Sequence, residues 1–101
     1  FEIIVVNDHS EDNTLKLVKD FIDSKNFNAR IINLMTGNSK KAAIEEGIKN
    51  SNGEIILCTD GDCNVSKHWI SAYASFFADK KPDLVFGPVT FNESYLCRCK
   101  L

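Results

Sequence analysis

Short apolar runs alternate with amphipathic stretches along the chain, and this alternation predicts strands that are followed by helices. The run at 2–6 (EIIVV) is apolar on both faces, which is typical of a buried parallel strand, and 29–34 (ARIINL) is the second predicted strand. We expect two more strands at 54–59 and 83–89, the last at an edge or a bend because Pro88 has no amide hydrogen. The pattern predicts an α/β fold with a mostly parallel sheet sandwiched by helices.

The segment after the first run predicts a helix that ends near Ser24. Ser10 and Asp12 are candidate N-caps, because their side-chain oxygens can accept the first free amide hydrogens of a helix. Apolar residues at helical spacing then form one stripe with two neighbours beside it: Leu15, Val18 and Ile22, flanked by Leu17 and Phe21.

A second helix is expected from about residue 40 to residue 50, with Ser39 as its N-cap. Ile44 and Ile48 fall on one face of it, together with Gly47. Gly53 fits the left-handed residue that commonly ends a helix.

A third helix is expected to begin near Ser66 and to end at the sequence KKPD. We expect this helix to bury Trp69, Ile70, Tyr73, Phe76 and Phe77. Trp69, Tyr73 and Phe77 could form a sugar-stacking platform, but aromatic residues at helical spacing more often pack in a core.

Length and composition restrict the class of protein. The chain has 101 residues, enough for one small domain, and its 44% hydrophobic and 26% charged residues are ordinary for a soluble globular protein. A net charge of -2 gives no basic footprint for nucleic acid, and no apolar run approaches the roughly 20 residues that cross a bilayer. Phe1 leads directly into a strand-like run, so we expect that part of the protein precedes it.

The four cysteines indicate reduced, structural thiols. Cys58 lies in an apolar run, where a free thiol behaves as a small hydrophobe. The pair Cys97 and Cys99 could bind a metal or form a strained disulfide, but no second Cys or His pair completes a zinc site with the usual spacing. Cys63 is the fourth cysteine. Reduced thiols favour a cytoplasmic location.

Acidic residues follow the first and third predicted strands. Asp8 comes just after the first, and Asp60 and Asp62 come just after the third. Open α/β sheets bind ligands outside the carboxyl ends of their strands, so the alternation predicts that the three acids share one rim. Two carboxylates separated by Gly61 suit Mg²⁺ or Mn²⁺ with a diphosphate, whereas the plainer alternative is a helix cap and a surface turn.

These segments resemble the family 2 glycosyltransferases. Residues 6–14 (VNDHSEDNT) are similar to the family's V-D-D-x-S-x-D-x-T run, with Asn7 in place of the first acid. Residues 37–63 resemble its next block, in which a Gly/Lys turn and a helix precede G-E, a strand and D-x-D. With the W-I that follows, the resemblance covers roughly residues 1–90, and the order and spacing of the blocks are far more specific than D-x-D alone.

The resemblance implies transfer of a sugar from a nucleoside-diphosphate donor, most commonly a UDP-sugar, to an acceptor sugar, lipid or polysaccharide in cell-wall or polysaccharide biosynthesis. It implies that Asp8 binds the donor's base and that Asp60 lies near the ribose and the metal. Asp62 would coordinate Mg²⁺ or Mn²⁺, and Lys40 or Lys41 would lie near the donor.

The resemblance also implies a Rossmann-like GT-A fold that is incomplete at both ends: a partial nucleotide-sugar-binding domain at 1–91 and an unassigned tail at 92–101. The family's first strand would precede Phe1, and the base of its inverting reaction would follow Val89. No residue here matches that base, since Glu93 is too close to D-x-D. The missing strand would expose a sheet edge, which favours a homodimer, and a membrane anchor would lie outside this sequence.

Two other classes compete with a transferase. A receiver-like phosphoacceptor domain also places acids at strand ends and uses a K-P pair such as Lys81-Pro82. The spacing argues against it, because Lys81 comes before the fourth predicted strand and the phosphoacceptor should lie nearer the midpoint between the first acids and the lysine. Modification of Asp60 by acetyl phosphate would reveal such a domain. A non-catalytic scaffold or interaction module is the other alternative, because intact acids in this chain do not make the chain itself active.

Overall fold

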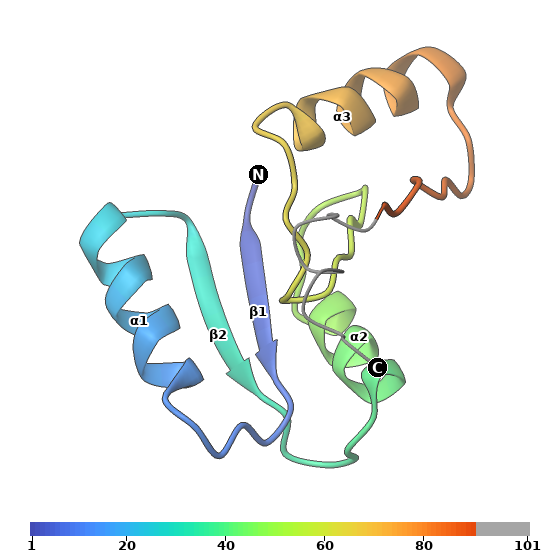
Figure 1. Cartoon of the computed structure of the whole chain (residues 1–101). Helices are drawn as coiled ribbons and strands as arrows, with labels where there is room; N and C mark the ends of the chain where they lie inside the picture. The colour runs from blue at the N-terminus through green and yellow to red at the C-terminus, as the bar shows by residue number, and fades with distance from the viewer. Residues whose placement is uncertain (91–101) are drawn as a thin grey trace, which may run out of the picture. The chain divides into compact units, whose positions relative to one another are not determined.

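The computed structural model describes residues 1–90 and divides the chain into two units, Phe1–Cys63 and Asn64–Leu101. The predicted tail at 92–101, with Glu93 and the two distal cysteines, lies outside the described residues. The helices and strands, labelled in Figure 1, are β1 (Ile3–Asn7), α1 (Thr14–Lys25), β2 (Ala29–Asn33), α2 (Lys40–Lys49) and α3 (Trp69–Lys80).

The first unit is built on a parallel pair of strands, which confirms the first two predicted strands to within one residue at either end. β1 and β2 pair in a register that runs from Ile3 opposite Ala29 to Asn7 opposite Asn33. The Leu34 amide continues the ladder by donating to the Asn7 carbonyl at 2.9 Å. At the same end the Asn7 side-chain amide donates to the Asn33 side chain at 3.1 Å. Both strands therefore finish together at one rim.

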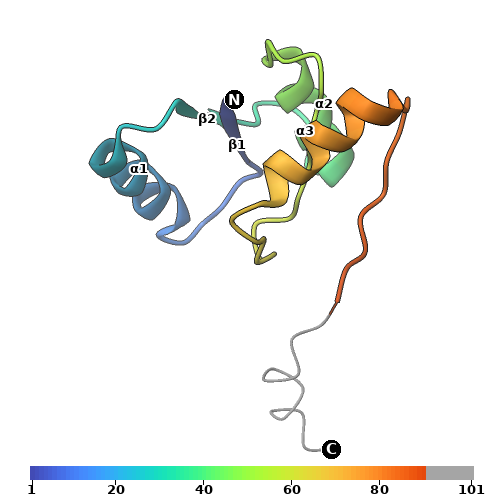
Figure 2. The ribbon, with the colours of Figure 1, turned by 90° about the horizontal axis from the view of Figure 1, so that it is seen from above.

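The two strands lie between α1 and α2, as both Figure 1 and Figure 2 show. α1 contacts β2, and α2 contacts β1. The approach of α2 is close at Gly47, where an added Cβ would lie 3.3 Å from Val6 Cγ2. Of the three residues that the sequence placed on one face, Gly47 lies against β1, whereas Ile44 and Ile48 are 37% and 46% exposed. A side chain at position 47 would therefore press against Val6, and glycine lets α2 lie close to β1.

The ends of the helices follow local hydrogen bonds. Ser39 caps α2 as predicted, because its Oγ accepts the Ala42 amide at 3.2 Å. The C-cap of α2 is Asn50, not Gly53, and the Asn50 side chain donates to the Glu46 carbonyl at 2.8 Å. A side-chain amide that satisfies a terminal carbonyl makes a left-handed glycine unnecessary.

The start of α1 also departs in part from expectation. Asp12 accepts the Thr14 amide at 3.0 Å, which lowers the pKa of the Asp12 carboxyl through hydrogen bonds from the Thr14 side chain and backbone. The N-cap of α1 is Asn13, which makes no capping side-chain hydrogen bond, so neither Asp12 nor Ser10 is the N-cap that was predicted. The Ser10 amide instead donates to Asn7 Oδ1 at 3.2 Å. The stripe of Leu15, Val18 and Ile22 is half-buried as predicted, whereas the flanking Leu17 and Phe21 are exposed.

The strands predicted at 54–59 and 83–89 are absent from the structure, where both segments are irregular. Cys58 is a free, exposed thiol and not the buried hydrophobe that was expected. Leu34, 6% exposed, is the one buried hydrophobic residue among residues 1–90. The α/β architecture is confirmed, with a sheet of two strands in the described part of the chain.

The second unit carries α3, which begins at Trp69, three residues beyond the expected start near Ser66. Trp69 and Tyr73 pack edge to face with ring centroids 5.6 Å apart and are half-buried with Phe77, whereas Ile70 and Phe76 are exposed. The described residues include no helix with both the length and the apolar character that crossing a bilayer requires.

Candidate functional site

Asp60 and Asp62 lie on an exposed loop that closes the first unit. The Cys63 amide donates to the Asp60 carbonyl at 3.2 Å, so the four residues from Asp60 form a tight turn with Gly61 within it. A Cβ built on Gly61 would meet no atom within 4 Å, so the space beside this glycine is open. The turn presents both carboxylates on one short piece of backbone.

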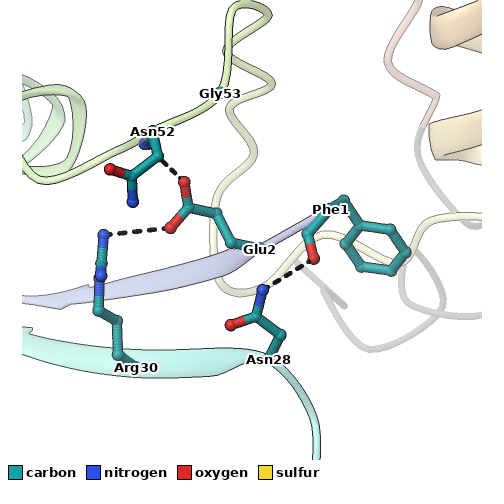
Figure 3. Close-up of a pocket in the computed structure, with 6 residues that line it drawn as sticks. All are labelled: Phe1, Glu2, Asn28, Arg30, Asn52 and Gly53. Atoms are coloured by element: carbon teal, nitrogen blue, oxygen red, sulfur yellow. Dashed lines mark hydrogen bonds and ion pairs between the residues drawn. The ribbon is translucent and has the colours of Figure 1, made fainter.

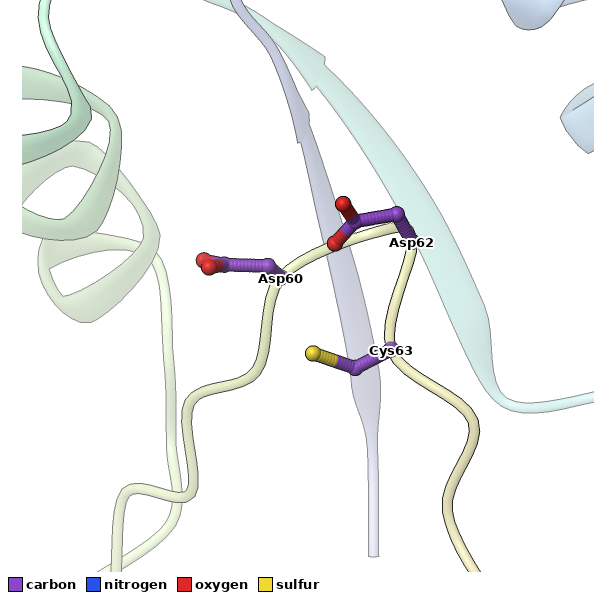
Figure 4. A group of neighbouring side chains, drawn as sticks. All are labelled: Asp60, Asp62 and Cys63. Atoms are coloured by element: carbon purple, nitrogen blue, oxygen red, sulfur yellow. The ribbon is translucent and has the colours of Figure 1, made fainter. Parts of the chain in front are cut away.

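The two carboxylates and the Cys63 thiol can reach one metal ion, because one ligand atom from each lies within 4.8 Å of the others. Figure 4 shows Asp60, Asp62 and Cys63 extending from the same loop. Carboxylate oxygens suit Mg²⁺ and Mn²⁺, whereas a thiol prefers softer metals. The donor set therefore fits a hard divalent ion through Asp60 and Asp62, with Cys63 as an additional neighbour.

Lys40 joins this loop from the start of α2. Its Nζ lies 2.6 Å from Asp60 Oδ1, and the two side chains are 70% and 54% exposed. The hydrogen bond to Asp60 and the charge of that carboxylate raise the pKa of Lys40, and the nearby Cys63 and Asp62 add to the effect. Lys41 points to a different partner, since its Nζ lies 3.8 Å from Glu45 on the same helix. Of the two lysines, Lys40 is the one that reaches the acidic loop.

Asp8 follows β1 at the rim where both strands end. It pairs with its neighbour, with His9 Nδ1 2.9 Å from Asp8 Oδ1, and His9 adopts a left-handed backbone with φ of 57°. Within residues 1–90, no ion pair or hydrogen bond joins Asp8 to Asp60 or Asp62. The structure thus brings Lys40 and Asp60 together and leaves Asp8 with its own local partner.

A separate open pocket of about 370 Å³ lies at the amino ends of the strands, where sequence patterns gave no signal. Figure 3 shows Glu2 at its centre, accepting from the Asn52 amide at 2.6 Å and from Arg30 Nη2 at 3.1 Å. The Asn52 bond, followed by the Arg30 bond, lowers the pKa of Glu2. Through these two bonds, Glu2 links the segment after α2 to β2 at the start of β1. The pocket is lined by Phe1, Glu2, Asn28, Arg30, Asn52 and Gly53.

Comparison with known proteins places this chain in a family. The family model "Glycosyl transferase family 2" matches residues 1–95. A poly-beta-1,6-N-acetyl-D-glucosamine synthase of Staphylococcus epidermidis is 39% identical over 91 residues, which are 90% of this chain and 21% of that protein. No solved structure matches.

Two further relatives agree with that family. Glycosyltransferase AglE of Haloferax volcanii is 31% identical over 91% of this chain and 30% of its own length. A dolichyl-phosphate beta-glucosyltransferase of Trichomonas vaginalis is 42% identical over 61% of this chain and 18% of its own length. The chain thus spans between about a fifth and a third of these relatives. The match to the family model covers nearly the whole chain, and the chain belongs to glycosyltransferase family 2.

Proposed function

We propose that the Phe1–Cys63 unit binds the nucleoside-diphosphate half of a sugar donor, as part of an enzyme that transfers the sugar to an acceptor with inversion. The observation that carries this proposal is the loop on which Asp60 and Asp62 lie together with Lys40 in contact. Membership of glycosyltransferase family 2 supports the reaction class and disfavours the receiver-like and scaffold alternatives.

Each residue of the loop has a role in this proposal. Asp62 and Asp60 hold Mg²⁺ or Mn²⁺, which when bound supplies Lewis-acid stabilisation to the departing diphosphate. Lys40 places its ammonium group against diphosphate oxygens, as a compact charge does at other phosphate sites. Gly61 leaves room for phosphate or ribose, because no atom lies within 4 Å of a Cβ built there.

Asp8 is proposed to bind the donor's base, and uracil is the base we favour. A carboxylate accepts hydrogen bonds, and uracil presents an N–H donor on the edge that pairs in nucleic acids. Asp8 is 34% exposed at its side chain and its present partner is the exposed His9, so a base can replace that contact at small cost. The base that deprotonates the acceptor is expected beyond the described residues.

The acceptor is proposed to be a growing polysaccharide. The support is the printed name of the Staphylococcus epidermidis relative, a poly-beta-1,6-N-acetyl-D-glucosamine synthase. A cytoplasmic location would keep the free thiols Cys58 and Cys63 reduced. A homodimer through a sheet edge stays a prediction.

Calorimetric titration of the chain with UDP, with and without Mn²⁺, tests the donor site. We expect binding that requires Mn²⁺ and falls at least about tenfold in Asp62→Ala, since loss of even an outer-shell partner of a metal ligand typically costs roughly 10–100-fold in metal affinity. Asp79→Ala is the matched control, because Asp79 is an exposed carboxylate on α3 that pairs only with the adjacent Lys80 in the described residues. GDP in place of UDP tests the choice of base.

Equal UDP binding by the wild-type chain and Asp62→Ala would contradict the metal role of Asp62. Equal loss in Asp79→Ala would show a general effect of charge. Tighter binding of GDP than of UDP would overturn uracil as the base while retaining the diphosphate site.

A further inference from the structure

One of the two carboxylates in the acidic loop already has a cation beside it. Lys40 Nζ is 2.6 Å from Asp60 Oδ1, a short charge-assisted contact. Any metal ion that uses this oxygen must therefore compete with the Lys40 ammonium group. Asp62 has no ion-pair partner within the described residues, so the competition falls on Asp60.

The stability of α2 does not explain a lysine at this position. Lys40 is the first residue of the helix, where the positive end of the helix dipole disfavours a cation. Ser39 already caps the helix through the Ala42 amide. The neighbouring Lys41 pairs with Glu45 along the helix, which is an ordinary stabilising arrangement. The favourable partner of Lys40 is therefore on the acidic loop and not on its own helix.

We propose that Lys40 couples metal binding to diphosphate binding. Without a diphosphate, Lys40 neutralises Asp60 and weakens the affinity of the loop for a free divalent ion. With a diphosphate present, the ammonium moves onto the new anion and leaves Asp60 to the metal. The loop then takes up metal and diphosphate together, and by linkage each ligand raises the affinity for the other by the same factor. This inference rests on the proposed donor site.

Exposure of the pair makes this exchange feasible. Both side chains keep more than half of their surface in solvent, at 70% for Lys40 and 54% for Asp60. An ion pair of this kind contributes little free energy, so a doubly charged metal or a diphosphate can displace either partner. The four-carbon stem of lysine lets the ammonium swing without moving α2.

The test is the affinity for Mn²⁺ alone, measured by electron paramagnetic resonance of the free ion, for the wild-type chain and Lys40→Met. Methionine retains the helix propensity and much of the side-chain length. We expect Lys40→Met to bind Mn²⁺ about two- to fivefold more tightly, the worth of an exposed ion pair. Adding UDP should raise the Mn²⁺ affinity of the wild-type chain by a larger factor than that of Lys40→Met. Lys41→Met removes the same charge one residue away and should bind Mn²⁺ as the wild type does.

Unchanged or weaker Mn²⁺ binding by Lys40→Met would overturn the coupling while leaving the proposed donor site intact. An equal gain in Lys41→Met would also overturn it, because a general change of charge would then account for the effect. Failure of every form to bind Mn²⁺, with UDP or without it, would overturn the coupling and the metal part of the proposed function together.

Discussion

Gly37 holds the turn that leads from β2 to α2, and replacing it with alanine should destabilise the first unit. Its φ of 83° lies in the region that residues with a Cβ rarely adopt, and a Cβ there would lie 3.0 Å from the Cβ of Ala42. The left-handed backbone costs an alanine about 1–2 kcal/mol, and the tight contact adds to that cost. Alanine also lowers the conformational entropy of the unfolded chain, which offsets about 0.4–1 kcal/mol of this destabilisation. We therefore expect a net loss of about 1–2 kcal/mol for Gly37→Ala.

Amide hydrogen exchange of β1 and β2, measured peptide by peptide, reports the stability of this unit directly. A loss of about 1–2 kcal/mol corresponds to exchange that is about 5- to 30-fold faster. Gly61→Ala is the matched control, since its φ is not positive and its Cβ would meet no atom within 4 Å. The control should leave exchange unchanged and weaken UDP binding. The reasoning is refuted if the two variants change exchange by the same factor.

Two further predictions concern the contacts that hold α2 and the segment after it. Ser39→Ala removes the acceptor of the Ala42 amide and should cost about 1 kcal/mol, seen as faster exchange in the first turn of α2; no change there would show that the cap contributes nothing. Glu2→Gln should reduce the loss of stability that the protein shows in acid. Hydrogen bonds from the Asn52 amide and from Arg30 lower the pKa of Glu2 in the folded protein. The ionised Glu2 therefore stabilises the fold at pH values above the ordinary glutamate pKa, and this stabilisation is lost as the pH falls through the lowered pKa. Urea unfolding at several pH values measures the free energy of unfolding, and identical pH profiles for the wild-type chain and Glu2→Gln would show that Glu2 does not contribute to the acid dependence.

Helices were predicted well from sequence because their signals are local. Ser39 and the Ala42 amide are three residues apart, so a short stretch of sequence is enough to predict the start of α2. A strand depends on a partner elsewhere in the chain. The apolar run at 54–59 has the composition of a strand but pairs with no other strand in the described structure, so the prediction from its composition was wrong. The sequence placed Gly47 on one face of α2 with Ile44 and Ile48, but only the proximity of Val6 in the structure shows that position 47 lies against the strand.

The candidate site was predictable in its residue types and less so in its contacts. The order of the acidic blocks was enough to single out Asp60 and Asp62 and to indicate the family. It did not decide whether Lys40 or Lys41 lies near the donor. Neighbouring residues on a helix point about 100° apart, and only the tertiary fold shows which one faces the loop. The ion pair with Asp60 now distinguishes Lys40. The expected association of Asp8 with the other acids depended on a third strand that the structure does not contain.

The paired amides at the ends of β1 and β2 explain how Asn7 can stand where the family motif has an acid. Asn7 donates to Asn33 and accepts from the Ser10 amide. An aspartate at position 7 could still accept from Ser10, and a half-turn of the Asn33 amide would present its NH₂ group in place of its oxygen. The second amide thus makes the two residue types interchangeable at position 7, and a motif search that insists on a carboxylate there would pass over proteins built in this way.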